Sequence, residues 1–338
     1  MTVRPDPGSA PDPGAAPDPG AARACAEPLW LRHPLWSAGA GALVIAFSAL
    51  LVERSGASPS TAAVFRCVYA LPLLAALAAR ERRRFGARPR AERRAAWFAG
   101  LFFAADLILW HHTINAVGTG LATVLANTQV VVVGIAAWVV LGERPERRVI
   151  IAVPVMLGGV VLISGVVGSG AFGQRPLLGG ALGLLTAVAY AGFLLLLRRS
   201  LSDLRRPAGP LLDASAVAAL AAVLAGWAYG DLDLAPAWPG HGWLVVLALS
   251  SQVLAWLLIS VSLPRLPAVV TSIVLLLQPV GAVAIGVGLL AETPSVVQYA
   301  GVVLVLAGVV AATLGRERQP GGAPPPAPGD VASVTLDR

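Results

Sequence analysis

The sequence predicts an all-α integral membrane protein with ten transmembrane helices, arranged as two inverted five-helix repeats. Of its 338 residues, 57% are hydrophobic and only 13% are charged, and the mean hydropathy is +0.75. Ordinary soluble domains are only about half apolar. Apolar segments of about 20 residues, the length that crosses ~30 Å of hydrocarbon, recur along the chain. The second half of the sequence also repeats the first.

Hydropathy and the polar breaks place five helices in each half. In the first half we expect helices at about 36 to 52 and 59 to 79, then 95 to 115 after the connection RERRRFGARPRAERR, and 118 to 141 and 147 to 167 on either side of ERPERR. In the second half we expect 177 to 197, then 211 to 230 after RRSLSDLRR, 242 to 262, 267 to 290 and 295 to 315.

Two tails flank the repeats. Residues 1 to 29 contain the Pro/Asp/Gly repeat PDPGSAPDPGAAPDPGAA, and residues 316 to 338 contain RERQPGGAPPPAPGD. Such compositions cannot bury an apolar face, so both tails are expected to be disordered. The predicted domains are therefore the two tails, a first repeat at 36 to 167 and a second repeat at 177 to 315.

The arginines predict the orientation. All basic residues are Arg, and 22 of the 25 fall in the two tails and in alternate connections, which places them on one side of the membrane. Arg54 and Arg175 fall on the other side, and Arg66 lies within a span. By the positive-inside rule both termini are cytoplasmic. The Arg-only, Ala/Gly/Pro-rich composition favours a bacterial inner (plasma) membrane. The same rule explains the net charge of +7 without nucleic acid.

The two halves align without a gap from LANTQVVVVGIAAWVVLGERPERR onward. The offset is 149 at each matched polar or small residue, and the pairs are Gln129 with Gln278, Glu143 with Glu292, Pro145 with Pro294 and Gly159 with Gly308. Because each repeat has an odd number of helices, the second enters the membrane from the opposite side. Inverted repeats of this kind place a binding site near the midplane and are typical of transporters.

These residues resemble the drug/metabolite transporter superfamily, specifically its EamA-type members, over about residues 36 to 315. The resemblance rests on the paired endings LGERP and LAETP, the Gly-containing helices that follow (MLGGVV, VLAGVV) and the Arg in VFRCVYALP. It implies a ten-helix fold and the export or uptake of a small metabolite. DLILWHH and QVLAWLL depart from the generic pattern, so the resemblance does not fix the substrate.

Two spans carry a polar residue followed one helical turn later by Trp. Asp106 precedes Trp110, and Gln252 precedes Trp256 at the same spacing, so each pair lies on one face of its helix. One interpretation is a polar and aromatic lining of a central substrate-binding cavity. The other is packing, in which Asp or Gln satisfies a neighbouring backbone group. A charge at the bilayer centre costs about 3 kcal/mol, which favours a partner or water near Asp106.

Arg66 is the expected partner of Asp106. From their positions in consecutive predicted helices, the two residues share a depth to within ~3 Å. Their salt bridge is either structural or broken during transport, and a buried pair is weak evidence for either. His111 is the second candidate for proton coupling because its ordinary pKa is near 6.5. His111 and His112 project about 100° apart, so at most one is expected to face a pathway.

Amides complete the candidate site. Asn127, Gln129 and Gln278 lie near mid-span, where they either bind a substrate carboxylate or amide or bond between helices. The repeat of Gln129 as Gln278 favours a role in the site. Glu143 and Glu292 instead precede Pro-containing helix starts, so we expect each to cap the helix that follows it. Pro279 and Pro154 are expected to kink their helices.

The sequence therefore predicts a secondary transporter that moves a small metabolite, such as an amino acid or a related amphipathic compound, by alternating access. Export is favoured over uptake, and proton coupling is left open. Its expected partners are this substrate, the bilayer and protons, with no nucleic acid. Because a GxxxxGK[ST] motif is absent from the sequence, ATP-driven transport is not expected. We also expect no cofactor, no metal and no enzymatic activity. A passive channel or sensor is the alternative, and a membrane-embedded transferase using Asp106 and His111 is a weaker one.

Overall fold

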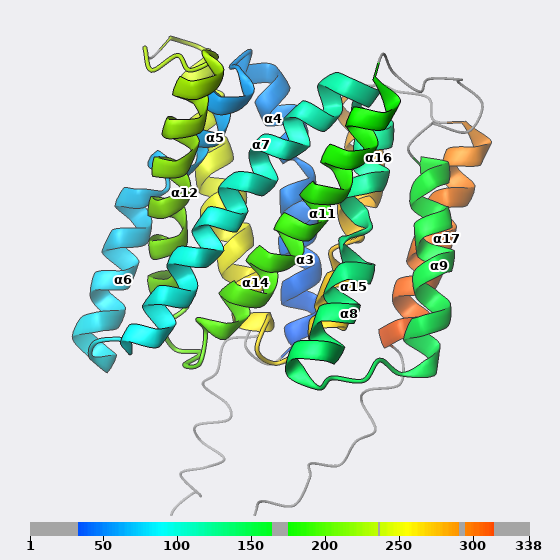
Figure 1. Cartoon of the computed structure of the whole chain (residues 1–338), viewed down its shortest axis with the longest axis horizontal. Coiled ribbons are helices and arrows are strands. Elements are labelled where there is room, and N and C mark those ends of the chain that lie inside the picture. Colours follow the sequence, from blue (N-terminus) through cyan, green and yellow to red (C-terminus); the bar gives the residue numbers. More distant parts are fainter. Residues whose placement is uncertain (1–32, 164–174, 236, 291–294, 314–338) are drawn as a thin grey trace, which may run out of the picture.

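The computed structural model describes residues 33–163, 175–235, 237–290 and 295–313, and these residues fold into a bundle of helices (Figure 1). Six helical segments are long and apolar enough to cross a membrane: Pro34–Ser55, Pro59–Phe85, Leu177–Arg199, Ala208–Tyr229, Gly240–Ser262 and Ala268–Leu289. Two shorter apolar helices lie at Leu125–Val140 and Val296–Ala312. The predicted all-helical membrane fold is confirmed.

The first half of the chain contains seven helical elements among the described residues. They are α3 (Pro34–Ala46), α4 (Ser48–Ser55), α5 (Pro59–Val68), α6 (Leu71–Phe85), α7 (Arg90–Asn127), α8 (Gln129–Leu141) and α9 (Arg147–Ile163). The second half contains α11 (Pro176–Arg199), α12 (Ala208–Tyr229), α13 (Gly240–Leu247), the π-helical segment η1 (Ala248–Ala255), α14 (Trp256–Ser262), α15 (Ala268–Val274), α16 (Leu277–Leu290) and α17 (Val296–Thr313).

Several predicted spans are therefore divided into shorter helices. Proline explains two of the breaks, because it has no amide N–H to donate to the carbonyl four residues earlier. Pro72 follows the end of α5 at Val68, and Pro279 follows the end of α15 at Val274. Pro154, in contrast, lies inside α9, which continues on both sides of it.

The predicted helices 95 to 115 and 118 to 141 differ from the structure in where the break falls. Helical residues run from Arg90 to Asn127, and the break comes at Thr128. The run is nevertheless not straight. A Cβ on Gly192 of α11 would lie 2.5 Å from Phe102 Cδ1, and a Cβ on Gly183 would lie 2.5 Å from Leu125 Cβ.

Helix geometry shows why α7 must fold back. Gly183 and Gly192 are about 14 Å apart along α11, whereas Phe102 and Leu125 would be about 35 Å apart in a straight helix. Both pairs are in contact, so α7 reverses direction between Phe102 and Leu125. Figure 1 shows the chain rising along α7 and descending to α8. The chain thus turns back between the two predicted helices, but the connection between the two legs of α7 is itself helical.

The two halves of the molecule pack through equivalent helices. A Cβ on Gly159 of α9 would lie 2.9 Å from Val305 of α17, and a Cβ on Gly308 of α17 would lie 2.2 Å from Met156 of α9. Val305 is related to Met156 by the same offset of 149 that relates Gly308 to Gly159. The two contacts are thus copies of each other. In Figure 1, α9 runs upwards and α17 runs downwards, as inverted repeats require.

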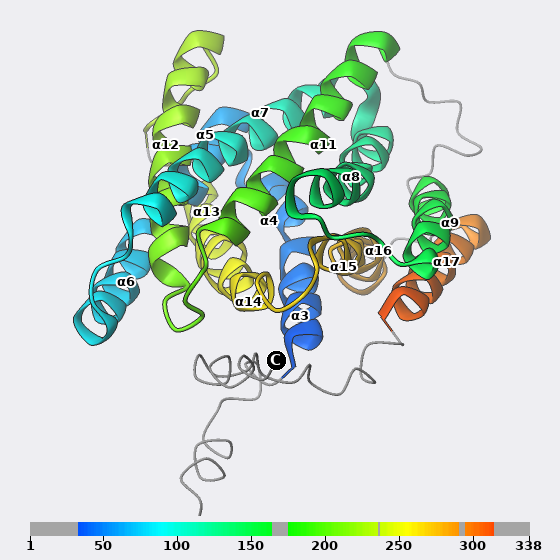
Figure 2. The ribbon, with the colours of Figure 1, turned by 60° about the horizontal axis from the view of Figure 1, so that its bottom comes forward.

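The halves also interleave. Figure 2 shows α3 of the first half between α14 and α15 of the second. A Cβ on Gly41 of α3 would lie 2.8 Å from the carbonyl oxygen of Ala255, so the two backbones approach closely there. The core therefore lies where the halves meet.

Glu143 was expected to cap the helix that follows it, α9, but its carboxylate bonds elsewhere. Its Oε2 accepts a hydrogen bond of 3.0 Å from the backbone N–H of Ala268, at the start of α15. Its Oε1 lies 2.8 Å from Arg198 Nη2, at the end of α11. The carboxylate thus joins the two halves, because three elements from distant parts of the chain meet at this end of the bundle. The equivalent expectation for Glu292 lies outside the described residues.

Candidate functional site

A cavity of about 190 Å³ lies between the two halves. Six of the residues singled out from the sequence line it, namely Arg66, Asp106, Trp110, Asn127, Trp256 and Gln278. These residues come from α5, both legs of α7, α14 and α16. Segments far apart in the sequence therefore converge here, at the position that inverted repeats favour for a binding site.

Arg66 is fixed by a buried hydrogen-bond relay. Its Nε donates to Gln252 Oε1 at 3.0 Å, and Gln252 Nε2 donates to Ser215 Oγ at 2.9 Å. The Arg66 guanidinium carbon also lies 5.6 Å from the centre of the Phe103 ring, within cation–π distance. Gln252 is 1% exposed and is not among the residues that line the cavity. It therefore orients Arg66 from behind.

The expected salt bridge between Asp106 and Arg66 is not among the ion pairs of the described residues. Both groups line the same cavity and are close enough to interact electrostatically. The hydrogen bond of the Arg66 guanidinium is instead made by its Nε, to Gln252. The cavity thus presents a cation and a carboxylate that are near each other and not directly bonded.

Four aromatic residues line the cavity, namely Phe103, Trp110, Tyr190 and Trp256, and the buried Phe193 packs against three of them. The rings of Phe103 and Phe193 stack with centroids 4.5 Å apart, and Trp256 meets Phe193 edge-on at 4.7 Å. Trp256 is 2% exposed, and its indole N–H has no acceptor among the described residues. Tyr190 meets Trp256 edge-on at 6.4 Å. These aromatic surfaces suit the apolar part of a ligand.

The repeated glutamines occupy different environments. Gln278 lines the cavity, and its Nε2 lies 3.4 Å from the Tyr190 hydroxyl. Gln129 is 1% exposed, and its Nε2 donates to the Ser272 carbonyl oxygen at 3.4 Å. Gln129 is not part of the cavity lining, although its Oε1 is buried without a partner among the described residues. The structure thus separates a pair that the repeat suggested was equivalent.

The histidines lie beside the cavity. His111 Nδ1 donates to the Leu107 carbonyl oxygen at 2.7 Å, and its ring meets Trp110 edge-on at 5.1 Å. The His112 ring faces Tyr229, with centroids 4.6 Å apart. The lining of the cavity includes neither histidine. His111 contacts the site only through Trp110.

Among the lining residues that the sequence analysis did not single out are two aromatic ones, Phe103 and Tyr190. Phe103 precedes Asp106 by three residues and Trp110 by seven, which is the spacing of one helical face, so the sequence contained a signal for it. Tyr190 is one of only four tyrosines and lies in the middle of a span, but no partner in the sequence marked it. Its place became evident only from the packing of α11 against α7.

The helical membrane fold, the repeated halves and a cavity between them that is lined by polar and aromatic residues are typical of a membrane transporter. Comparison with protein families bears this out: the EamA-like transporter family matches residues 35–165 and 177–314. The chain belongs to the EamA-like transporter family, within the drug/metabolite transporter superfamily, and is a transporter and not an enzyme.

A solved structure titled only "Crystal structure of protein" is similar to this chain, with a TM-score of 0.67 at 17% identity. The alignment covers 83% of this chain and 96% of that one. At this identity the similarity shows the fold alone. A search of the curated proteins found no match.

Proposed function

We propose that this transporter carries a small zwitterionic amphipathic metabolite, such as an amino acid, by alternating access. The observation that supports it is the presence of Arg66 and Asp106 in one cavity without a direct salt bridge. A substrate carboxylate would accept hydrogen bonds from Arg66, and its ammonium group would donate to Asp106. The apolar part would lie against Phe103, Trp110 and Trp256.

We further propose export driven by protons, with Asp106 as the coupling residue. A carboxylate within the membrane is expensive to keep charged unless it is paired, hydrated or protonated. Asp106 has an Arg nearby and no hydrogen bond among the described residues, so a proton and a substrate ammonium can compete for it. His111 is a weaker candidate, because its Nδ1 is already engaged by Leu107.

The proposed location is a bacterial inner membrane, with both termini in the cytoplasm. The Arg-rich connections after α6, α8 and α11 all lie at the lower end of the bundle in Figure 1, together with the start of α3 and the end of α17. This common end supports the orientation that the positive-inside rule predicts.

The test is flux in proteoliposomes with amino acids that stabilise the purified protein against heat. Asp106→Asn is expected to retain counterflow exchange and to lose accumulation driven by a pH gradient. Asp233→Asn, on an exposed residue far from the cavity, is the matched control. If Asp106→Asn leaves the pH dependence unchanged, Asp106 is not the coupling residue. Flux that does not saturate and shows no counterflow would instead support the passive channel.

A further inference from the structure

A second cavity, of about 350 Å³, lies at the Arg-rich end of the bundle, between α6, α12 and the 86–88 connection. Four arginines and two carboxylates line it, namely Arg82, Arg88, Arg93, Arg206, Glu81 and Asp213. It does not share a lining residue with the cavity that contains Asp106. The proposed transport function makes no use of it.

The two carboxylates are already engaged. Glu81 accepts hydrogen bonds of 2.9 Å from the backbone N–H groups of Ala208 and Gly209, at the start of α12. Asp213 Oδ2 lies 2.6 Å from Arg88 Nη2 and 3.9 Å from Arg93 Nε. Asp213 therefore forms ion pairs with two arginines, and the arginines that line the cavity outnumber the carboxylates.

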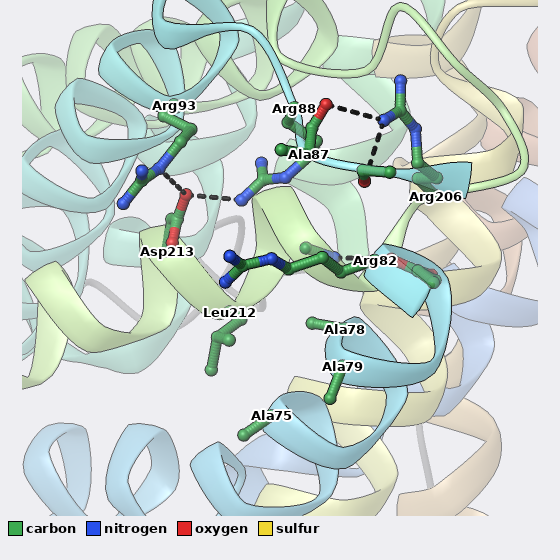
Figure 3. A pocket seen from close by; sticks show the side chains of 13 residues that line it. Ala75, Ala78, Ala79, Arg82, Ala87, Arg88, Arg93, Arg206, Leu212 and Asp213 are labelled. Atoms are coloured by element: carbon green, nitrogen blue, oxygen red, sulfur yellow. Dashed lines mark hydrogen bonds and ion pairs between the residues drawn. The ribbon is translucent and has the colours of Figure 1, made fainter. Parts of the chain in front are cut away.

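Arg82 contributes most directly to that excess. Its side chain forms none of the ion pairs found in the described part of the chain. Figure 3 shows it extending across the cavity towards Asp213 and Arg88. Arg88 Nη1 is also buried and has no hydrogen-bond partner among the described residues. The charged end of the cavity thus contains donors that need an acceptor.

The other end of the cavity is apolar. Ala75, Ala78 and Ala79 of α6 and Leu212 of α12 line it, and Figure 3 shows them on the opposite side of Arg82 from Arg88. Ala75, Ala78, Ala79 and Arg82 follow the spacing of one helical face, so the lining changes from apolar to cationic along α6. In Figure 1, α6 and α12 lie at the edge of the bundle, where a membrane protein meets lipid.

We propose that this groove binds an anionic phospholipid, with the phosphate at Arg82 and Arg93 and an acyl chain along Ala75, Ala78 and Leu212. Arginines beside an apolar groove at the positive end of a membrane protein match such a ligand in both charge and shape. A free anion would use only the charged end. Because α6 belongs to the first half and α12 to the second, the lipid would bridge the two repeats.

The experiment is native mass spectrometry of the full-length protein in micelles that contain phosphatidylglycerol or phosphatidylcholine. We expect phosphatidylglycerol to be retained in preference to phosphatidylcholine. Arg82→Gln should weaken retention about fivefold, and Arg82→Gln with Arg93→Gln about 25-fold. Arg83→Gln is the matched control, because Arg83 is exposed on the same helix and does not line the groove.

Two further arms test the identity of the ligand. Ala75→Phe changes an exposed position in the apolar half of the groove. It should weaken the retention of phosphatidylglycerol and leave competition by inorganic phosphate unchanged. Equal losses in Arg82→Gln and Arg83→Gln would show only general attraction to a basic surface and overturn the proposal. Equal retention of both lipids would overturn it too. The proposal would also be overturned if inorganic phosphate displaced the lipid fully and Ala75→Phe had no effect on retention, because that result indicates a free-anion site.

Discussion

At the scale of single residues, the contacts of Arg66 determine the chemistry of the central cavity. A guanidinium within the membrane needs partners for its N–H groups, and Gln252 provides one through a bond of 3.0 Å. Gln252 also bonds to Ser215, so both its amide oxygen and its amide nitrogen already have protein partners. Gln252 thus positions Arg66, whereas Asp106 lines the cavity itself.

Replacing Gln252 by Leu is therefore expected to destabilise the protein more than it changes substrate preference. The substitution leaves Arg66 and Ser215 without these partners, and a lost hydrogen bond to a charged group costs about 1.5–3 kcal/mol. Thermal unfolding in detergent measures the effect. Ser250→Ala, in the same π-helical segment, removes an exposed hydroxyl that bonds to the Val246 carbonyl and should be nearly neutral. A Gln252→Leu protein with unchanged stability and a raised KM would show that Gln252 binds substrate.

At the scale of elements, the interruption between α15 and α16 positions Gln278. Helix α15 ends at Val274, and α16 begins at Leu277, one residue before Gln278. The break before α8 at Thr128 likewise precedes Gln129, so both repeats interrupt the same helix near its glutamine. Discontinuous helices with unpaired backbone groups near the midplane are a common feature of transporter binding sites.

Restoring the helix should impair transport without unfolding the protein. Pro279→Ala supplies the missing N–H for the Leu275 carbonyl, which favours a continuous helix and turns Gln278 away from Tyr190. We expect flux in proteoliposomes to fall about tenfold or more, equivalent to about 1.4 kcal/mol in the barrier. Pro154→Ala is the control, since Pro154 lies inside α9 and does not line the cavity. If both variants transport like the wild type, the break is not required for function.

The packing of α9 against α17 makes a second prediction at this scale. A Cβ on Gly159 would lie 2.8 Å from the carbonyl oxygen of Gly301, whereas a Cβ on Gly158 would meet nothing within 4 Å. Gly159→Ala should therefore destabilise the protein by about 1–3 kcal/mol through overpacking. Gly158→Ala should stabilise it by about 0.5–1 kcal/mol, because Ala favours the helix. If the two variants have the same unfolding curve, the close packing at Gly159 is contradicted.

At the scale of the whole molecule, two inverted halves meet in a shared core, and their connections divide by charge. The Arg-rich connections lie at one end of the bundle, with the start of α3 and the end of α17 (Figure 1). The connection between α12 and α13 lies at the other end and contains Asp231 and Asp233. This asymmetry predicts the orientation in the membrane.

The chain contains its own reporter of that orientation. Cys25 lies in the N-terminal tail, and Cys67 is fully buried. A membrane-impermeant maleimide should therefore label Cys25 only after the cells are permeabilised. In a variant with Cys25→Ala and Ala235→Cys, the new thiol lies in the α12–α13 connection and should react in intact cells. Labelling of Cys25 from outside would reverse the proposed orientation.

The sequence by itself determined the helices, the repeat and the family. Hydropathy and span length are local properties, because any segment in hydrocarbon must satisfy its own backbone, so ten apolar segments predict a helical membrane protein. The Arg distribution and the offset of 149 are likewise visible without coordinates. Spacing along a helix also placed Asp106 and Trp110 on one face, and both line the same cavity.

Only the tertiary structure decided what each polar residue contacts. Gln129 and Gln278 are equivalent in the repeat, but one bonds to the Ser272 backbone and the other lines the cavity. Glu143 bonds to the start of α15 and not to the helix that follows it. These choices depend on how each helix is rotated and on which distant helix lies beside it. Sequence patterns specify the face of a helix, whereas the partner of that face is set by the packing of the whole bundle.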